Sequence, residues 1–250
     1  MSSNVRTVSE TKRAFYTLHT RPINSIYRRV VDELMVEMHL LSVNADYRYD
    51  PIYGLGVVTA FDRFMQGYRP EADKTSIFNA LCQALQDDAQ KYRRDAEQLQ
   101  SEAAAISADD FLSQVKQLND ATARVLYVKQ PIDASSSVLY EVLRAVANNP
   151  KFKYSRLFAI GLYTVLELMD PSLVKDESKR NQALQTLSEV LNLSGDKMQK
   201  DLELYRSNLD KIAQAQIVLD DILKADRKKK EERAKAKDTV TTPSDSQESS

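Results

Sequence analysis

Apolar residues recur along most of this chain at steps of three and four positions, the spacing that places side chains on one face of an α-helix. The clearest stretch begins after Pro22, a residue that favours the first turn of a helix. Its apolar members are Ile23, Ile26, Tyr27, Val30, Val31, Leu34, Met38 and Leu41. The pattern predicts a long helix there with one buried face.

Start signals divide the rest of the chain into further helices. Thr7 and Glu10 have capping-box spacing, and Asp50-Pro51 is a second start signal. The remaining expected helices are one opened by Asp73, a polar one around 92–99, one from Ser107 towards Tyr127, and three over 137–148, 154–169 and 179–193. The VLYVK segment at 125–129 has strand-like composition but no partner strand, so it is expected to be helix or connector. The prediction is an all-α bundle of about nine helices in a domain of residues 1–195.

The last expected element differs in its spacing. From Asp196 onward, apolar residues alternate at steps of four and three, with Gln216 as the one polar member. This coiled-coil-like seam consists of Met198, Leu202, Tyr205, Leu209, Ile212, Leu219 and Leu223. The pattern predicts a second region, a long helix over 196–237 of roughly 60 Å at the standard rise, whose far half leaves the body. Residues 238–250 are polar and are expected to be disordered.

Composition supports helices and argues against several kinds of site. The chain has only 5 glycines and 7 prolines in 250 residues, which leaves little material for hairpins or phosphate-binding loops. No apolar run approaches the ~20 residues needed to span a bilayer, so a soluble or peripheral protein is expected. Cys82 is the single cysteine, and its apolar helical context favours a buried core role over a nucleophile.

The residues that could carry chemistry do not form a recognisable catalytic or metal-binding pattern. His19 and His39 are the two histidines, and with Cys82 they lack the spacing of a zinc site. Gly54-Leu-Gly56 lacks the third glycine of a dinucleotide fingerprint, so close helix packing is the preferred interpretation. We therefore predict no catalytic residue, no metal and no cofactor.

Two groups of aromatic and basic residues are candidates for a partner surface. Tyr47, Arg48 and Tyr49 combine aromatic rings with a guanidinium, which is typical of protein interfaces. The alternative is that Arg48 pairs with Asp50 and the tyrosines cover one end of the bundle. The other group is Arg21, Arg28 and Arg29, which could bind a partner or an anionic surface, or could simply form a solvated helix face.

The end of the long helix is strongly basic. The run RKKKEERAKAK at 227–237 has seven basic and two acidic residues. Its first four residues, Arg227, Lys228, Lys229 and Lys230, are candidates for contact with an anionic surface. A solvated extension is the alternative, and nucleic acid is not expected because the whole chain is slightly acidic and the run lacks interleaved aromatics.

Several segments together resemble a known family. They are RAFYTLHTRPINSIYRRV at 13–30, YRYDPIYGLGVVTAFDRFM at 47–65, IFNALC at 77–82, KYSRLFAIGLY at 153–163 and DLELYRSNLDKIAQA at 201–215. With these segments the chain resembles the thylakoid formation protein family of cyanobacteria and plastids, over nearly its whole length.

The resemblance implies a function that the residue patterns do not. It implies a non-catalytic auxiliary factor of photosystem II biogenesis and repair, linked to an FtsH-type membrane protease or to photosystem II components. It also implies peripheral attachment to thylakoid membranes, on the cytoplasmic side in a cyanobacterium or the stromal side in a plastid. The alternative function is a pigment or small-molecule carrier, because a helical bundle can enclose a ligand between its helices. Self-association stays open.

Overall fold

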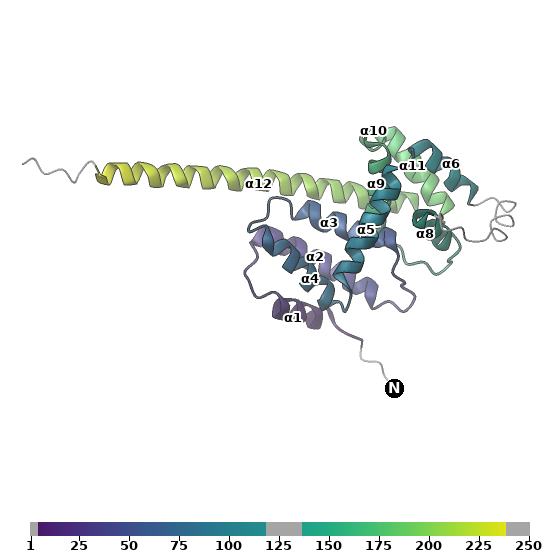
Figure 1. The fold of residues 1–250 in the computed structure, drawn as a ribbon, viewed down its shortest axis with the longest axis horizontal. Helices are drawn as coiled ribbons and strands as arrows, with labels where there is room; N and C mark the ends of the chain where they lie inside the picture. Colours follow the sequence, from purple (N-terminus) through teal and green to yellow (C-terminus); the bar gives the residue numbers. More distant parts are fainter. Residues whose placement is uncertain (1–4, 119–136, 239–250) are drawn as a thin grey trace, which may run out of the picture. The chain divides into compact units, whose positions relative to one another are not determined.

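The computed structural model describes residues 5–118 and 137–238, without the side chains of 219, 220, 223 and 233–238. The described residues form eleven helices and no strand (Figure 1). The all-α class predicted from the sequence is therefore confirmed. The helices are α1 (Val8–Leu18), α2 (Ser25–Ser42), α3 (Pro51–Phe64), α4 (Ala72–Ala84), α5 (Ala89–Ala104), α6 (Ala108–Gln117), α8 (Val138–Ala147), α9 (Arg156–Met169), α10 (Pro171–Lys175), α11 (Glu177–Val190) and α12 (Gly195–Asp238).

Thr7, Asp50 and Ser107 cap α1, α3 and α6, as the sequence predicted. α2 differs from the prediction, because Asn24 caps it and Pro22 lies before its first residue, Ser25. Thr7 and Glu10 form the complete capping box at the start of α1. The Asp50 side chain accepts a hydrogen bond from the Tyr53 N–H at 2.8 Å, with Pro51 in the first turn of α3. The extra helix relative to the prediction is α10. The expected helix over 154–169 ends at Met169 as α9 does, but the chain starts a new helix at once: Asp170 caps α10 and Pro171 is its first residue.

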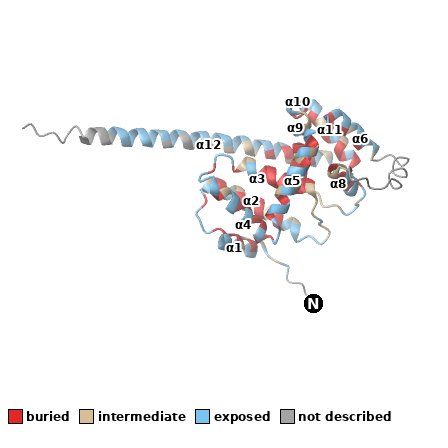
Figure 2. Ribbon diagram, viewed as in Figure 1, coloured by how far each residue is buried: buried red, intermediate tan, exposed pale blue. Residues whose placement is uncertain are grey.

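The chain divides into two compact units, residues 1–207 and 208–250. Helix α12 begins at Gly195, next to the predicted domain boundary, and its first turns belong to unit 1. The core of unit 1 is built around α3 and α9, which pack more extensively on each other than any other pair of helices. Both are buried along most of their length (Figure 2).

Glycines allow α3 and α9 to approach closely. A Cβ atom on Gly56 would collide with the backbone carbonyl of Leu157, and one on Gly161 would collide with that of Ile52. Gly54 instead faces the end of the Tyr49 side chain. The close helix packing predicted for Gly54 and Gly56 is confirmed for Gly56, where the backbones of α3 and α9 meet and a side chain would keep them apart.

Candidate partner surface

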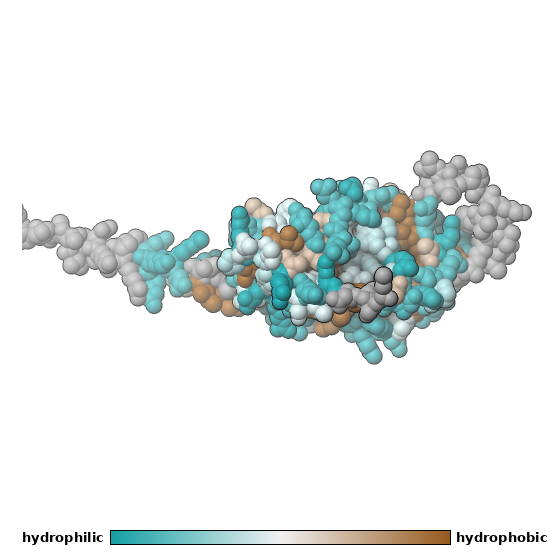
Figure 3. Space-filling view, turned by 90° about the horizontal axis from the view of Figure 1, so that it is seen from below, coloured by the Kyte–Doolittle hydropathy of each residue, from teal (hydrophilic) through white to brown (hydrophobic). Residues whose placement is uncertain are grey.

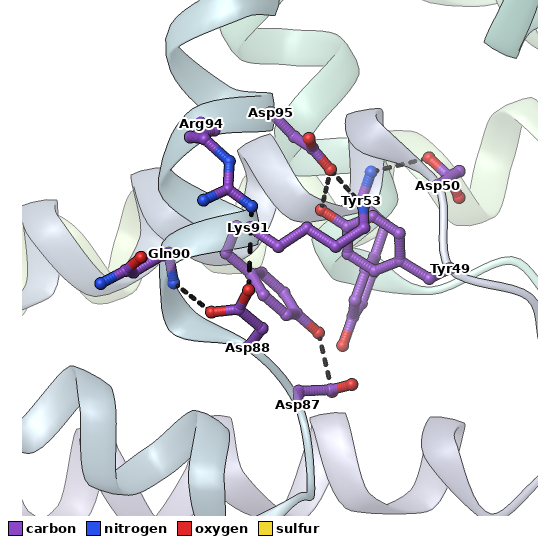
Figure 4. A network of polar contacts seen from close by, with 10 residues as sticks. Tyr49, Asp50, Tyr53, Asp87, Asp88, Gln90, Lys91, Arg94 and Asp95 are labelled. Atoms are coloured by element: carbon purple, nitrogen blue, oxygen red, sulfur yellow. Dashed lines mark hydrogen bonds and ion pairs between the residues drawn. The ribbon is translucent and has the colours of Figure 1, made fainter.

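One polar cluster is centred on Tyr49, just before α3. Its hydroxyl donates a hydrogen bond to Asp95 Oδ2 at 2.7 Å, and Lys91 Nζ lies 2.5 Å from the same carboxylate oxygen. The Lys91 ammonium also lies 3.7 Å from the centroid of the Tyr49 ring (Figure 4). We call these three residues the Tyr49 tie. It fastens the chain before α3 to the side of α5.

The tie continues into a group of packed tyrosine rings. The Tyr49 ring packs edge to face on Tyr92 and Tyr53, with centroids 5.1 and 6.1 Å apart, and Tyr53 packs likewise on Tyr47 at 5.6 Å. The Tyr92 hydroxyl donates to Asp87 Oδ2 at 3.0 Å. Burial raises the pKa of all four phenols, so they stay neutral at ordinary pH.

Asp50 lies beside these rings and combines two opposing influences. Its carboxylate caps α3, an interaction that favours the charged form. Burial acts against that charge and is the larger effect, so the pKa of Asp50 is raised to about 7. Asp50 is therefore a group whose charge changes near neutral pH within the fold.

The predicted surface of Tyr47, Arg48 and Tyr49 is only partly exposed. Both tyrosines are half-buried, and the Tyr49 hydroxyl is engaged by Asp95. Arg48 is exposed and donates to the carbonyls of Ala45 and Tyr47 at 2.9 and 2.6 Å. Of the three residues, Arg48 is the one that is exposed.

The second predicted group is divided by the fold. Arg28 and Arg29 line a groove of about 560 Å³ along α2, together with Lys12 from α1. Arg21 is tied instead to the buried carboxylate of Asp73, at the start of α4. The three arginines were predicted as one patch because they lie close in sequence, and the structure gives Arg21 a separate structural contact.

The α2 groove mixes charge with apolar surface. Its acidic residues are Asp32, Glu33 and Glu37, and Arg29 Nε forms an ion pair with Glu33 at 2.9 Å. Leu40, also in the groove, is 59% exposed. An exposed leucine among charges of both signs is suited to contact with protein side chains.

The residues considered for metal binding or catalysis lie apart in the core. His39 Nδ1 contacts Thr11 Oγ1 at 2.9 Å, and His19 Nδ1 contacts Ser76 Oγ at 3.1 Å. Burial lowers the pKa of both imidazoles. Cys82 is buried, and its pKa is raised to about 12. In the described ranges, no three acidic, histidine or cysteine side chains are grouped to hold a metal ion.

The predicted seam of α12 changes character along the helix. Met198, Leu202 and Tyr205 are buried, whereas Leu209 and Ile212 are half-buried. The side chains of Leu219 and Leu223 lie outside the described residues. Arg227, Lys228, Lys229 and Lys230 are all exposed. Among the residues that the structure describes, none of the helices is long and apolar enough to cross a membrane.

Sequence reasoning missed the partners that complete the Tyr49 tie. Lys91 and Asp95 are four positions apart on α5, a spacing that indicates an ion pair between them. It does not indicate that this pair also contacts the Tyr49 side chain. Their contact with Tyr49 spans more than forty residues of sequence, and a single sequence contains no signal for it.

The fold and these surfaces define an all-helical protein that presents grooves and charged helix faces. Comparison with known proteins gives its family. The model of the thylakoid formation protein family matches residues 7–234. Protein Thf1 of Trichormus variabilis is 57% identical over 239 residues, which cover 96% of this chain and 97% of the relative. Protein Thf1 of Nostoc punctiforme is 56% identical over 246 residues, covering 98% and 100%.

A solved structure extends the likeness to three dimensions. The structure of Psb29 has a TM-score of 0.72 and 44% sequence identity, covering 90% of this chain and 98% of that one. The chain belongs to the thylakoid formation protein family.

Proposed function

We propose that this chain is a non-catalytic adaptor in photosystem II biogenesis and repair and in thylakoid membrane formation. It acts by binding and stabilising an FtsH-type protease complex of the thylakoid. It attaches peripherally, on the cytoplasmic side in a cyanobacterium or the stromal side in a plastid, and needs no cofactor for this role.

The observation that carries the proposal is the extent of the family match. It runs over residues 7–234, and so includes the helical body together with nearly all of α12. Because the family match includes helices throughout the chain, it suits a binding protein whose contact surfaces lie on several helices. The α2 groove with Arg28, Arg29 and Leu40 is the surface on unit 1 that we assign to the protease.

Co-purification from thylakoids tests this assignment. The tagged full chain would be expressed in a cyanobacterium that lacks the native copy, and the FtsH-type protease recovered with it would be quantified. Arg28→Glu with Arg29→Glu reverses two of the three positive charges in the groove and should lower recovery about tenfold, the change expected for losing about 1.4 kcal/mol. The half-life of the protease after translation is blocked should shorten in the same strain.

The matched control is Lys175→Glu with Lys179→Glu, which reverses two exposed charges on α10 and α11. This variant should recover the protease as the unaltered chain does. Equal loss in both variants, or a protease half-life that does not respond to deletion of the chain, would contradict the proposal. Visible absorbance in the natively purified protein would favour the carrier function instead.

A further inference from the structure

The turn between α2 and α3 recurs between α8 and α9. Asn44 follows α2 and accepts two backbone N–H groups at 3.0 Å, one at its side chain from two residues on and one at its carbonyl from three residues on. Asn149 follows α8 and accepts from the same relative positions, also at 3.0 Å each. The two turns have the same hydrogen-bond pattern.

The Tyr49 tie also has a second copy. The Tyr154 hydroxyl, just before α9, donates to Asp201 Oδ2 at 2.8 Å, and Lys197 Nζ lies 4.8 Å from the centroid of the Tyr154 ring. Lys197 and Asp201 are four positions apart on α12, as Lys91 and Asp95 are on α5. The relation of α3 to α5 is thus repeated between α9 and α12.

The contacts between α3 and α9 are reciprocal. Gly56 faces the carbonyl of Leu157, and Gly161 faces that of Ile52. Gly56 follows Tyr49 by seven residues, and Gly161 follows Tyr154 by seven residues. Each glycine is followed three residues later by a buried threonine. The two helices therefore meet through equivalent surfaces.

The remaining helices correspond as well. Gln86 after α4 and Asn192 after α11 are the two non-glycine residues with positive φ in the described ranges, at 65° and 56°. In both places the next N–H returns to the carbonyl five residues back, at 2.9 and 2.8 Å. α1 packs on α4, and α6 packs on α11. The series α1, α2, α3, α4, α5 is matched by α6, α8, α9, α11, α12.

The correspondence ends within α12. The buried residues Tyr92, Ala96 and Leu99 of α5 correspond to Met198, Leu202 and Tyr205 of α12. The last residue of α5, Ala104, then corresponds to residue 210, close to the end of unit 1 at Ser207. Beyond residue 210, α12 continues to Asp238 without a counterpart in the first half.

We infer that residues 7–210 are an internal duplication, and that the rest of α12 is a recognition helix added to the second copy. The partner that binds this recognition helix is an amphipathic helix of another protein, whose apolar stripe ends in acidic residues. This inference goes beyond the proposed function because it holds whichever protein supplies the partner helix.

The recognition helix presents apolar and then basic surface. Ile217, Val218 and Ile222 are 62%, 58% and 52% exposed, and the four residues 227–230 that follow are exposed cations. Figure 3 shows hydrophobic surface followed by hydrophilic surface along this part of α12. This segment has no counterpart in the first half, so the repeated pattern of helices does not account for its apolar side chains.

The exposed side chains of the recognition helix indicate which kind of partner it binds. Val218 and Ile222 lie on one helix face, and one stripe of this kind packs on another helix. Four consecutive cations favour carboxylates on the partner. Asp221 is exposed directly beside Ile222, so its charge opposes insertion of the apolar stripe into an anionic bilayer, whereas the acidic end of a partner helix faces the four cations that follow. A protein helix with an acidic end satisfies both the apolar and the basic surface.

Two synthetic helical peptides test the occupant. Both carry the same apolar heptad stripe over about three heptads, and one ends in glutamates while the other ends in lysines. Binding to the full chain would be measured by fluorescence anisotropy. The glutamate peptide should bind at least about tenfold more tightly than the lysine peptide. Ile217→Ala with Val218→Ala and Ile222→Ala should weaken its binding about tenfold.

Leu204→Ala is the matched control. Leu204 is 46% exposed on the same helix, but within the duplicated part, so peptide binding should not change. Absence of binding to either peptide, equal binding to both, or equal loss in Leu204→Ala would overturn the inference. Binding to phosphatidylcholine vesicles only when phosphatidylglycerol is included, without peptide binding, would make the occupant a lipid surface. A dimer in sedimentation that the triple variant abolishes would make it a second copy.

Discussion

Asp50 caps α3, and its carboxyl group also changes charge near neutral pH. Because its pKa in the folded chain is about 7 and that of an unfolded aspartate is 3.8, the folded state holds the proton more tightly. The free energy of unfolding contributed by this residue is therefore highest below pH 3.8. It falls as pH rises and is lost above about pH 7.

Asp50→Asn is expected to remove this dependence while keeping the cap, because asparagine is also a good N-cap residue. The variant should gain stability relative to the unaltered chain between pH 5 and pH 8, by a few kcal/mol at most. Urea unfolding at the two pH values measures the difference. The two buried histidines have lowered pKa values, so they make the free energy of unfolding rise with pH. They are present in both proteins, so their effect cancels in the comparison. A difference that does not change with pH would show that burial does not control this carboxylate.

At the residue scale, the sequence predicted the local role of a side chain better than its contacts with residues far away in the sequence. The capping roles of Thr7 and Asp50 were predicted because they depend on neighbours within a few positions. The place of Arg21 was not, because its partner Asp73 lies on another helix. Tyr49 was recognised as notable, but its hydroxyl proved to be directed to Asp95.

At the element scale, the packing of α3 on α9 depends on small residues at the crossing. Gly56→Ala places a methyl group against the Leu157 carbonyl, which is backbone and cannot move aside. We expect a loss of about 3 kcal/mol in the free energy of unfolding, at the upper end for overpacked cores. Gly54→Ala should cost less, because its new methyl group meets the end of a side chain, that of Tyr49, and not backbone. Thermal and urea unfolding of the two variants measure this order, and the reverse order would contradict the crossing as described.

Helices were predictable from the sequence where periodicity and start signals agreed. The segment after Pro22 and the one after Asp50 became α2 and α3. α10 was missed because Asp-Pro can follow one helix and begin another, and its five residues are too few for a periodic pattern.

At the scale of the whole molecule, the body and the recognition helix should separate in stability experiments. A chain that stops after Asp210 keeps every helix of the duplicated body. We expect its free energy of unfolding to fall by less than about 1 kcal/mol, a shift of a few degrees in Tm. Leu202→Asp should instead cost about 3 kcal/mol or more, because it buries a charge without a partner. Calorimetry of both variants checks this. Equal losses would show that the helix beyond residue 210 contributes to the core.

The repeat itself could not be seen in the sequence. Few positions are identical between the halves, and α10 adds a helix to the second half alone. What the halves share is hydrogen bonding at Asn44 and Asn149 and close packing at Gly56 and Gly161, and these appear only in three dimensions.

The reciprocal contact of Gly56 and Gly161 bears on the origin of the chain. Before duplication, a single copy would have carried one such helix, with a broad apolar face and no second helix to cover it. Two separate molecules could bury that face by crossing these helices about a twofold axis, the usual symmetry of homodimers. Under the duplication that we infer, the crossing of α3 and α9 derives from the interface of such a dimer. The end of the second copy would then have been free to acquire a helix that the first copy lacks.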